Sequence, residues 1–139
     1  MIVLDTNVLS ETLRPSPSAV VLRWLAAQER LAVFMTVITQ AEVLYGVESL
    51  PAGKRRDRLS AAIGRILVDE FPGRILPFDE DAANVYPKIV ARREAMGRPI
   101  SQFDAMIASI ALSRRAAVAT RDIPDFEHCG VRIVNPWVE

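Results

Sequence analysis

Short apolar runs with a β-branched bias alternate along this chain with longer segments of helical character. The runs that are typical of buried strands occupy residues 2–4, 30–36, 74–78, 116–120 and 131–134. The segments between them indicate a short helical turn at 8–13 and helices at 19–28, 37–49, 54–68, 80–96 and 100–115. This alternation favours an α/β fold, in which a parallel sheet is covered by helices on both faces.

Capping residues and prolines refine the predicted boundaries. Ser18 and Asp79 each precede a helical segment and are good N-caps. Pro77, in the run 74–78, favours an edge position or the end of a strand, because proline cannot donate to a sheet ladder. Pro87 lies inside the helical pattern 80–96 and predicts a kink or a break there.

The size and composition of the chain favour one domain spanning residues 1–139. Half of the 139 residues are hydrophobic, which is enough for a sizeable core without disulfides or structural metals. The single cysteine, Cys129, excludes an internal disulfide and fits a reducing, cytoplasmic environment. We expect no signal peptide, because the N-terminus lacks a basic lead and a long apolar run. We also expect no membrane-spanning segment, because no window approaches the roughly 18 to 20 apolar residues that a spanning helix requires.

The chain as a whole is not a polycation, since 17 basic residues balance 17 acidic ones. Binding to a nucleic acid would therefore depend on local positive charge. The basic residues gather in three groups, each of which could equally be a solvated helix face: Lys54, Arg55, Arg56 and Arg58; Arg92, Arg93 and Arg98; Arg114 and Arg115.

Four acidic residues occupy positions from which they could meet. Asp5 and Asp122 each follow an apolar strand, and the ends of neighbouring parallel strands lie on the same rim of a sheet. Asp104 lies near the start of a helix that is apolar on more than one side. Glu42 lies on the helix after the second strand, which can run back towards the same rim.

Each acid also has an ordinary structural interpretation, and only the combination favours a shared site. Asp5 could be an N-cap, Asp104 could stabilise the positive end of its helix dipole, Glu42 could close a capping box over residues 39–42, and Asp122 could pair with Arg121.

Carboxylates that converge repel one another, so they need a cation to remain ionised together. All-oxygen ligation suits Mg²⁺ or Mn²⁺, whereas zinc is disfavoured because the chain has a single histidine and a single cysteine. Such ions support phosphodiester hydrolysis. The sequence contains neither a G-x-S-x-G nucleophile motif nor a glycine-rich phosphate loop.

Four motifs, taken in order, resemble PIN-domain ribonucleases, in particular the VapC-like toxins of bacterial toxin–antitoxin pairs. The first is the opening segment 2–7, the second is 39–42 with Gly46, the third is 104–108, and the last is 119–122 followed by Phe126. Residues 73–79 and 135–137 are similar to the FitB-like branch. The resemblance covers nearly the whole chain.

The resemblance implies a fold, a site and a set of partners. The fold would be a PIN-like three-layer α/β/α domain with a central parallel sheet of five strands. Asp5, Glu42, Asp104 and Asp122 would hold Mg²⁺ or Mn²⁺ for RNA cleavage, with Asn7 and Thr120 as supporting residues. A cognate antitoxin would block the site, and the protein would form a homodimer or a larger toxin–antitoxin assembly. Arg121 could reach a substrate phosphate or pair with a neighbouring acid.

Two readings compete with the ribonuclease. A phospho-acceptor receiver domain also gathers acids at the rim of a sheet, but it normally needs a lysine after its last strand, and no lysine follows Lys88. A PIN-like binding module that does not cut nucleic acid is the other alternative, and the four acids argue against it.

Overall fold

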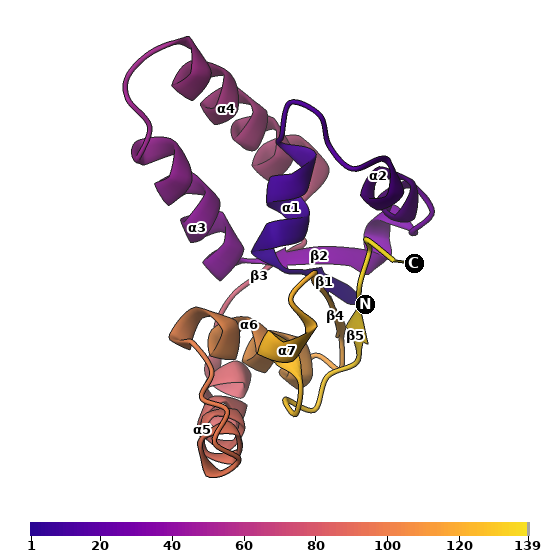
Figure 1. Cartoon of the computed structure of the whole chain (residues 1–139), viewed down its shortest axis with the longest axis vertical. Helices are drawn as coiled ribbons and strands as arrows, with labels where there is room; N and C mark the ends of the chain where they lie inside the picture. The colour runs from indigo at the N-terminus through magenta and orange to yellow at the C-terminus, as the bar shows by residue number, and fades with distance from the viewer. Residues whose placement is uncertain (139) are drawn as a thin grey trace.

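The computed structural model describes residues 1–138 and has a parallel sheet at its centre (Figure 1). Its strands are β1 (Ile2–Leu4), β2 (Val33–Thr36), β3 (Ile75–Leu76), β4 (Ala117–Ala119) and β5 (Ile133–Val134). They lie in the order β3-β2-β1-β4-β5, and every pair of neighbours is parallel. Leu4 in β1 is in register with Ala119 in β4, so these two central strands end at the same rim.

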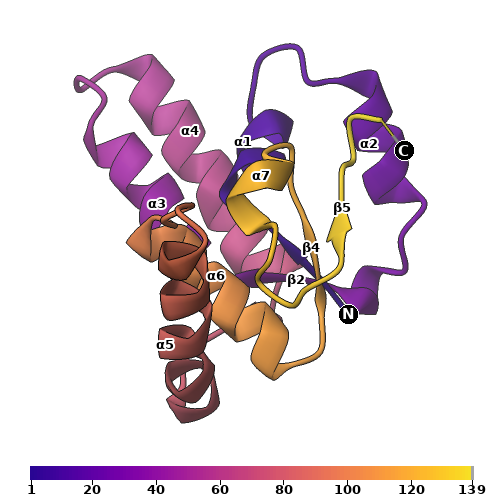
Figure 2. The same cartoon turned by 60° about the horizontal axis from the view of Figure 1, so that its bottom comes forward.

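Helices cover both faces of this sheet. One face carries α1 (Thr6–Thr12), α2 (Ala19–Ala26), α3 (Val37–Glu48) and α4 (Lys54–Arg65), and the other carries α5 (Glu80–Ala95), α6 (Gln102–Ser113) and α7 (Ile123–Phe126) (Figures 1 and 2). A 3₁₀ turn at Arg30–Ala32 precedes β2, and a π-helical turn at Ile66–Glu70 follows α4. The predicted three-layer α/β/α arrangement is confirmed.

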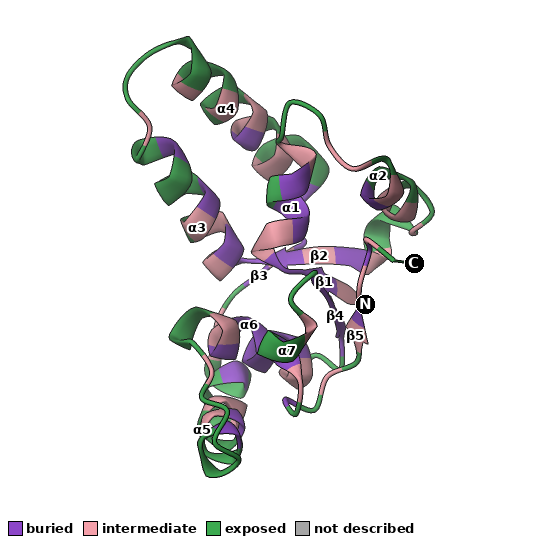
Figure 3. Ribbon diagram, viewed as in Figure 1, coloured by how far each residue is buried: buried purple, intermediate pink, exposed green. Residues whose placement is uncertain are grey.

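Two hydrophobic cores hold the layers together, because successive side chains of a strand point to opposite faces. Val3 packs into the core under α5 and α6, whereas its neighbour Leu4 packs into the core under α1 and α3. β4 is buried along its whole length, as expected for a strand with helices on both sides (Figure 3). The rim where β1 and β4 end is therefore fixed by packing from both faces.

Most predicted boundaries hold, with instructive exceptions. Ser18 and Asp79 cap their helices, and the short β3 beside Pro77 lies at the edge of the sheet. Residues 30–32 form a 3₁₀ turn rather than the start of a strand. The helix α5 is not broken at Pro87, because proline removes only one backbone donor and α5 packs along α6.

Within residues 1–138, no helix combines the length and the apolar character that crossing a membrane requires.

Candidate acidic site

Asp5 lies where β1 gives way to α1, and its carboxylate is almost fully buried. Its backbone N–H donates to Ala119 O at 2.9 Å, which extends the ladder between β1 and β4 by one bond. Its carboxylate Oδ1 accepts from the backbone N–H of Thr6, and Oδ2 accepts from the hydroxyl of Thr120, both at 2.8 Å. Asp5 is thus the N-cap of α1, and its second oxygen ties β1 to the end of β4.

Burial raises the pKa of Asp5 to about 6, because a carboxylate that loses water favours its neutral form. The hydrogen bonds from Thr120 and Thr6 oppose this rise in pKa, and the negative charges of Asp104 and Glu42 add to it. Asp104 and Glu42 therefore lie close enough to Asp5 to affect its ionisation, although they are 99 and 37 positions away in the sequence.

Glu42 reaches this rim from the second turn of α3. Its Oε1 accepts from the hydroxyl of Thr6 at 2.7 Å. A hydroxyl has a single proton, so the 2.9 Å contact between the hydroxyls of Thr6 and Thr39 must have Thr39 as its donor. The predicted capping box over 39–42 is wrong, because α3 begins earlier and Thr36 caps it by accepting from the N–H of Thr39.

A second group of contacts joins the start of α1 to the loop after β4. The Thr120 hydroxyl, which donates to Asp5, accepts from Asn7 Nδ2 at 3.2 Å and from the N–H of Asp122 at 3.0 Å. Asn7 Nδ2 also donates to Asp122 Oδ2 at 3.0 Å. Thr120 and Asn7 therefore connect Asp5 to Asp122 through hydrogen bonds, and their supporting part in catalysis stays a prediction.

Asp104 lies in the first turn of α6 and is half-buried. Its backbone N–H donates to the hydroxyl of Ser101, which caps the helix. Burial raises the pKa of its carboxyl group, and the charges of Asp125, Glu42 and Asp122 raise it further. Asp104 is thus within electrostatic range of Glu42 and Asp122, while hydrogen bonds through Thr6, Thr120 and Asn7 link Asp5 to Glu42 and Asp122 at the rim.

Two residues close to this rim were not predicted from the sequence to belong to the site. Thr6 orients Glu42, and its position directly after Asp5 was the available signal. Asp125, on α7, is the first of the charges that raise the pKa of Asp104. No sequence signal identified Asp125, because its position depends on how the loop after β4 turns.

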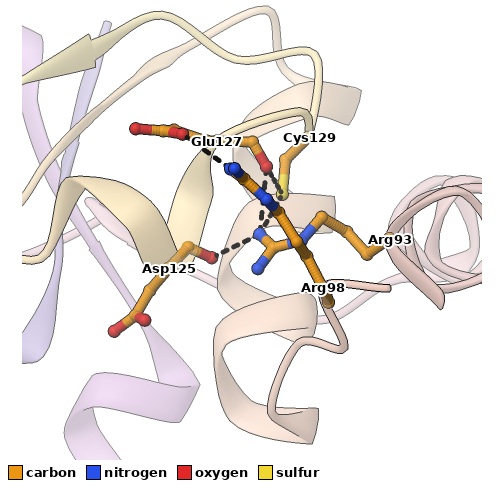
Figure 4. A network of polar contacts seen from close by, with 5 residues as sticks. All are labelled: Arg93, Arg98, Asp125, Glu127 and Cys129. Carbon is orange, nitrogen blue, oxygen red and sulfur yellow. Dashed lines mark hydrogen bonds and ion pairs between the residues drawn. The ribbon is translucent and has the colours of Figure 1, made fainter. Parts of the chain in front are cut away.

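The backbone of that loop is held by a buried arginine, Arg93 of α5 (Figure 4). Its Nη1 donates to the carbonyls of Asp125 and Glu127, both at 3.0 Å, and its Nε donates to the carbonyl of Arg98 at 2.7 Å. The carboxylate of Asp125 points away from this guanidinium (Figure 4). Arg93 therefore fixes the loop without neutralising its acids, and it is not available to bind RNA at the surface.

Arg121 stacks on an aromatic ring instead of pairing with a neighbouring acid, and its contact with a substrate phosphate stays a prediction. Its guanidinium carbon lies 5.2 Å from the centre of the Trp137 ring, a cation–π arrangement. Within residues 1–138 it forms no ion pair with Asp122 or with another acid. The interpretation of Asp122 as a loop acid paired with Arg121 is therefore wrong, since Asn7 is its partner.

None of the four acids has a basic partner in the described part of the chain. The ion pairs among residues 1–138 involve Glu11, Glu48, Asp79 and Glu127 instead. Within residues 1–138, no three acidic, histidine or cysteine side chains are close enough together to enclose a metal ion. The donor set still fits a hard divalent cation, because it is all oxygen, partly desolvated and without an internal counter-charge.

Comparison with known proteins agrees with this arrangement. The model of the PIN domain family matches residues 2–129. The chain is 40% identical to the VapC ribonuclease Y4jK of Sinorhizobium fredii over 99% of its own length and 98% of that protein. It is also 40% identical to the toxin FitB of Neisseria gonorrhoeae, over 99% of both chains.

The fold is that of a solved relative. The chain superposes on a chain of the structure of FitAB bound to the IR36 DNA fragment with a TM-score of 0.93 and 40% identity, covering 99% of this chain and 96% of the other. This match removes the receiver domain as an alternative. The chain belongs to the PIN-domain family, in the branch that contains VapC ribonucleases and the toxin FitB.

Proposed function

We propose that this protein is a metal-dependent endoribonuclease and the toxin of a toxin–antitoxin pair. The observation that carries the proposal is that Asp5, Glu42 and Asp122 are linked at one rim through Thr6, Thr120 and Asn7, with Asp104 in electrostatic range, and that none of these acids has a basic partner within residues 1–138. A metal-dependent nuclease needs such a group to hold a divalent cation beside a phosphodiester. The relatives named VapC ribonuclease and toxin FitB support the same activity.

The chain's own residues would divide the work as follows. Asp5, Glu42, Asp104 and Asp122 would hold Mg²⁺ or Mn²⁺ through carboxylate oxygens. When bound, such an ion polarises the phosphodiester and lowers the pKa of a water molecule. Asn7 would keep Asp122 in place, because its amide bridges that acid and Thr120.

The proposal includes the protein partners. FitB is a toxin and was solved as part of FitAB on DNA, so we propose that a cognate antitoxin binds this chain and covers its acidic rim. We also propose a homodimer, which a toxin–antitoxin assembly would then enlarge. Co-expression with the product of any small open reading frame beside the gene, followed by measurement of the mass of the free protein and of the complex, tests both.

Removal of divalent cations tests the activity. Purified, antitoxin-free protein is expected to cleave RNA in Mg²⁺ or Mn²⁺, to lose that cleavage in excess EDTA, and to regain it when the ion is restored. Gel analysis of labelled RNA measures all three states. Cleavage that is undiminished in EDTA would contradict the metal requirement, and binding of RNA without any cleavage would favour the binding-module alternative.

The hydroxyl of Thr6 gives a finer test of how Glu42 is held. Thr6→Val removes the donor to Glu42 and the acceptor of the Thr39 hydroxyl, while the backbone N–H that serves Asp5 remains. By analogy with residues that orient metal ligands, cleavage should fall by about 10- to 100-fold. Initial rates over a range of Mg²⁺ concentrations should show that part of the loss is recovered at high Mg²⁺.

The same helix supplies a control for this substitution. Thr12→Val in α1 makes the same chemical change where the hydroxyl only donates to the carbonyl of Leu9. Thr6→Ser keeps the hydroxyl and should retain most of the activity. A loss of equal size in the Thr6 and Thr12 valine variants would show that α1 is damaged generally and that Thr6 has no special part in holding Glu42.

A further inference from the structure

A groove leads away from the acidic rim along the face of the molecule that carries α1, α3 and α4. It has a volume of about 810 Å³, and Thr6 and Glu42 form one part of its lining. Because these two residues also belong to the acidic site, the groove and the site are continuous. Its volume lies in the range of about 300 to 1,000 Å³ that is usual for ligand-binding clefts.

Positive charge lines this groove. Arg55 and Arg58, one turn apart on α4, contribute to the lining together with Arg14 after α1. Arg55 and Arg58 are exposed, and neither forms an ion pair within residues 1–138. Their neighbour Arg56, which is outside the lining, is instead paired with Glu48 at 2.8 Å. In a chain of zero net charge, two arginines that form no ion pair within the described residues thus line the same groove as Glu42.

We propose that this groove binds the RNA strand next to the bond that is cut, with Arg55 and Arg58 on its phosphates. The inference rests on the proposed ribonuclease activity. Acids at the rim repel phosphates, so a substrate needs positive charge close by, and the planar guanidinium group forms paired hydrogen bonds with phosphate oxygens. Apolar side chains in the lining, such as Leu59, offer a surface for the faces of unstacked bases.

Charge removal provides the first test. RNA binding is measured by fluorescence anisotropy with a labelled, short single-stranded RNA of mixed sequence, on antitoxin-free protein carrying Asp104→Asn so that the RNA stays intact. Adding Arg55→Gln and Arg58→Gln should raise Kd at least about tenfold at moderate salt. The slope of log Kd against log salt should fall by about 1.4, because each phosphate contact on a single strand contributes about 0.7.

A matched control removes the same charge elsewhere. Arg23→Gln with Arg132→Gln changes two exposed arginines outside the groove lining that have no ion pair within the described residues. This pair should leave Kd within about twofold, since only general attraction is reduced. An equal loss of binding in the two double variants would overturn the proposal, and so would an unchanged Kd in the Arg55 and Arg58 variant.

A steric test leaves the charge unchanged. Gly46 of α3 lines the groove, and a Cβ built there meets no atom within 4 Å. Gly46→Leu should therefore obstruct the groove and weaken RNA binding, while thermal unfolding should occur at an equal or higher temperature because leucine favours a helix more than glycine does. Normal RNA binding by this variant would contradict the proposal.

The two proposals can fail separately. If the wild type cleaves RNA but the groove variants bind and cleave it normally, the proposal that the groove binds RNA is rejected and the proposed ribonuclease activity is retained. If the groove variants lose RNA binding but the wild type never cleaves RNA, the proposed RNA-binding groove is retained and the proposed ribonuclease activity is rejected. If the groove variants retain RNA binding and lose only the antitoxin, the groove serves a protein partner, and the RNA proposal is overturned.

Discussion

The Asp5→Asn protein is expected to cleave RNA at least about a hundredfold more slowly than the wild type and yet to be more stable without divalent cations. Asparagine cannot supply the negative charge that a bound Mg²⁺ or Mn²⁺ requires. It also removes a buried charge whose pKa is raised to about 6 by burial and by the neighbouring acids. The free energy of unfolding should therefore rise by about 1 kcal/mol or more near pH 8 in EDTA.

Opposite changes in activity and stability distinguish this outcome from a folding defect. Thermal unfolding in EDTA measures stability, and initial rates of RNA cleavage in Mg²⁺ measure activity. Asp69→Asn is the matched control, because Asp69 is exposed and lies outside the acidic rim; it should change neither quantity appreciably. Loss of cleavage together with a lower unfolding temperature would indicate damage to the fold, and near-normal cleavage would exclude Asp5 from the site.

The strands and the positions of the acids at their ends could be predicted because both follow from local pattern. Ile2, Val3 and Leu4 are apolar and Asp5 is not, so the strand had to end there with its acid at a rim. The same reasoning predicted Asp122 after β4, and the register of Leu4 with Ala119 accounts for its success.

The hydrogen bonds within the site could not be predicted in this way. The Thr6 hydroxyl meets Glu42 across 36 positions of the sequence, and that contact depends on the angle at which α3 crosses the sheet. Arg93 appeared to belong to a surface cluster, but its guanidinium is buried among backbone carbonyls of a loop 32 to 34 positions away. Periodicity shows which face of a helix is apolar, but it does not reveal which loop will pack on that face.

The metal-free protein should lose stability as the pH rises from about 4 to about 6. In the unfolded chain Asp5 titrates near its ordinary pKa of 3.8, whereas in the folded protein its pKa is about 6. Between these values the folded state holds more protons than the unfolded state, so the free energy of unfolding falls with rising pH. The difference in pKa corresponds to about 3 kcal/mol, and the raised pKa of Asp104 acts in the same direction.

Urea denaturation in EDTA at a series of pH values measures how the free energy of unfolding depends on pH. Comparison with Asp5→Asn isolates the contribution of Asp5 to this dependence, because the other titrating groups are common to both proteins. The wild type should lose more stability over this interval than the variant does. Added Mg²⁺ should restore the wild type above about pH 6, where Asp5 is ionised, and should have little effect near pH 4, where protons occupy the site. A pH dependence that is identical in the two proteins would show that Asp5 has an ordinary pKa, and the electrostatic case for a cation at this rim would then lose its main support.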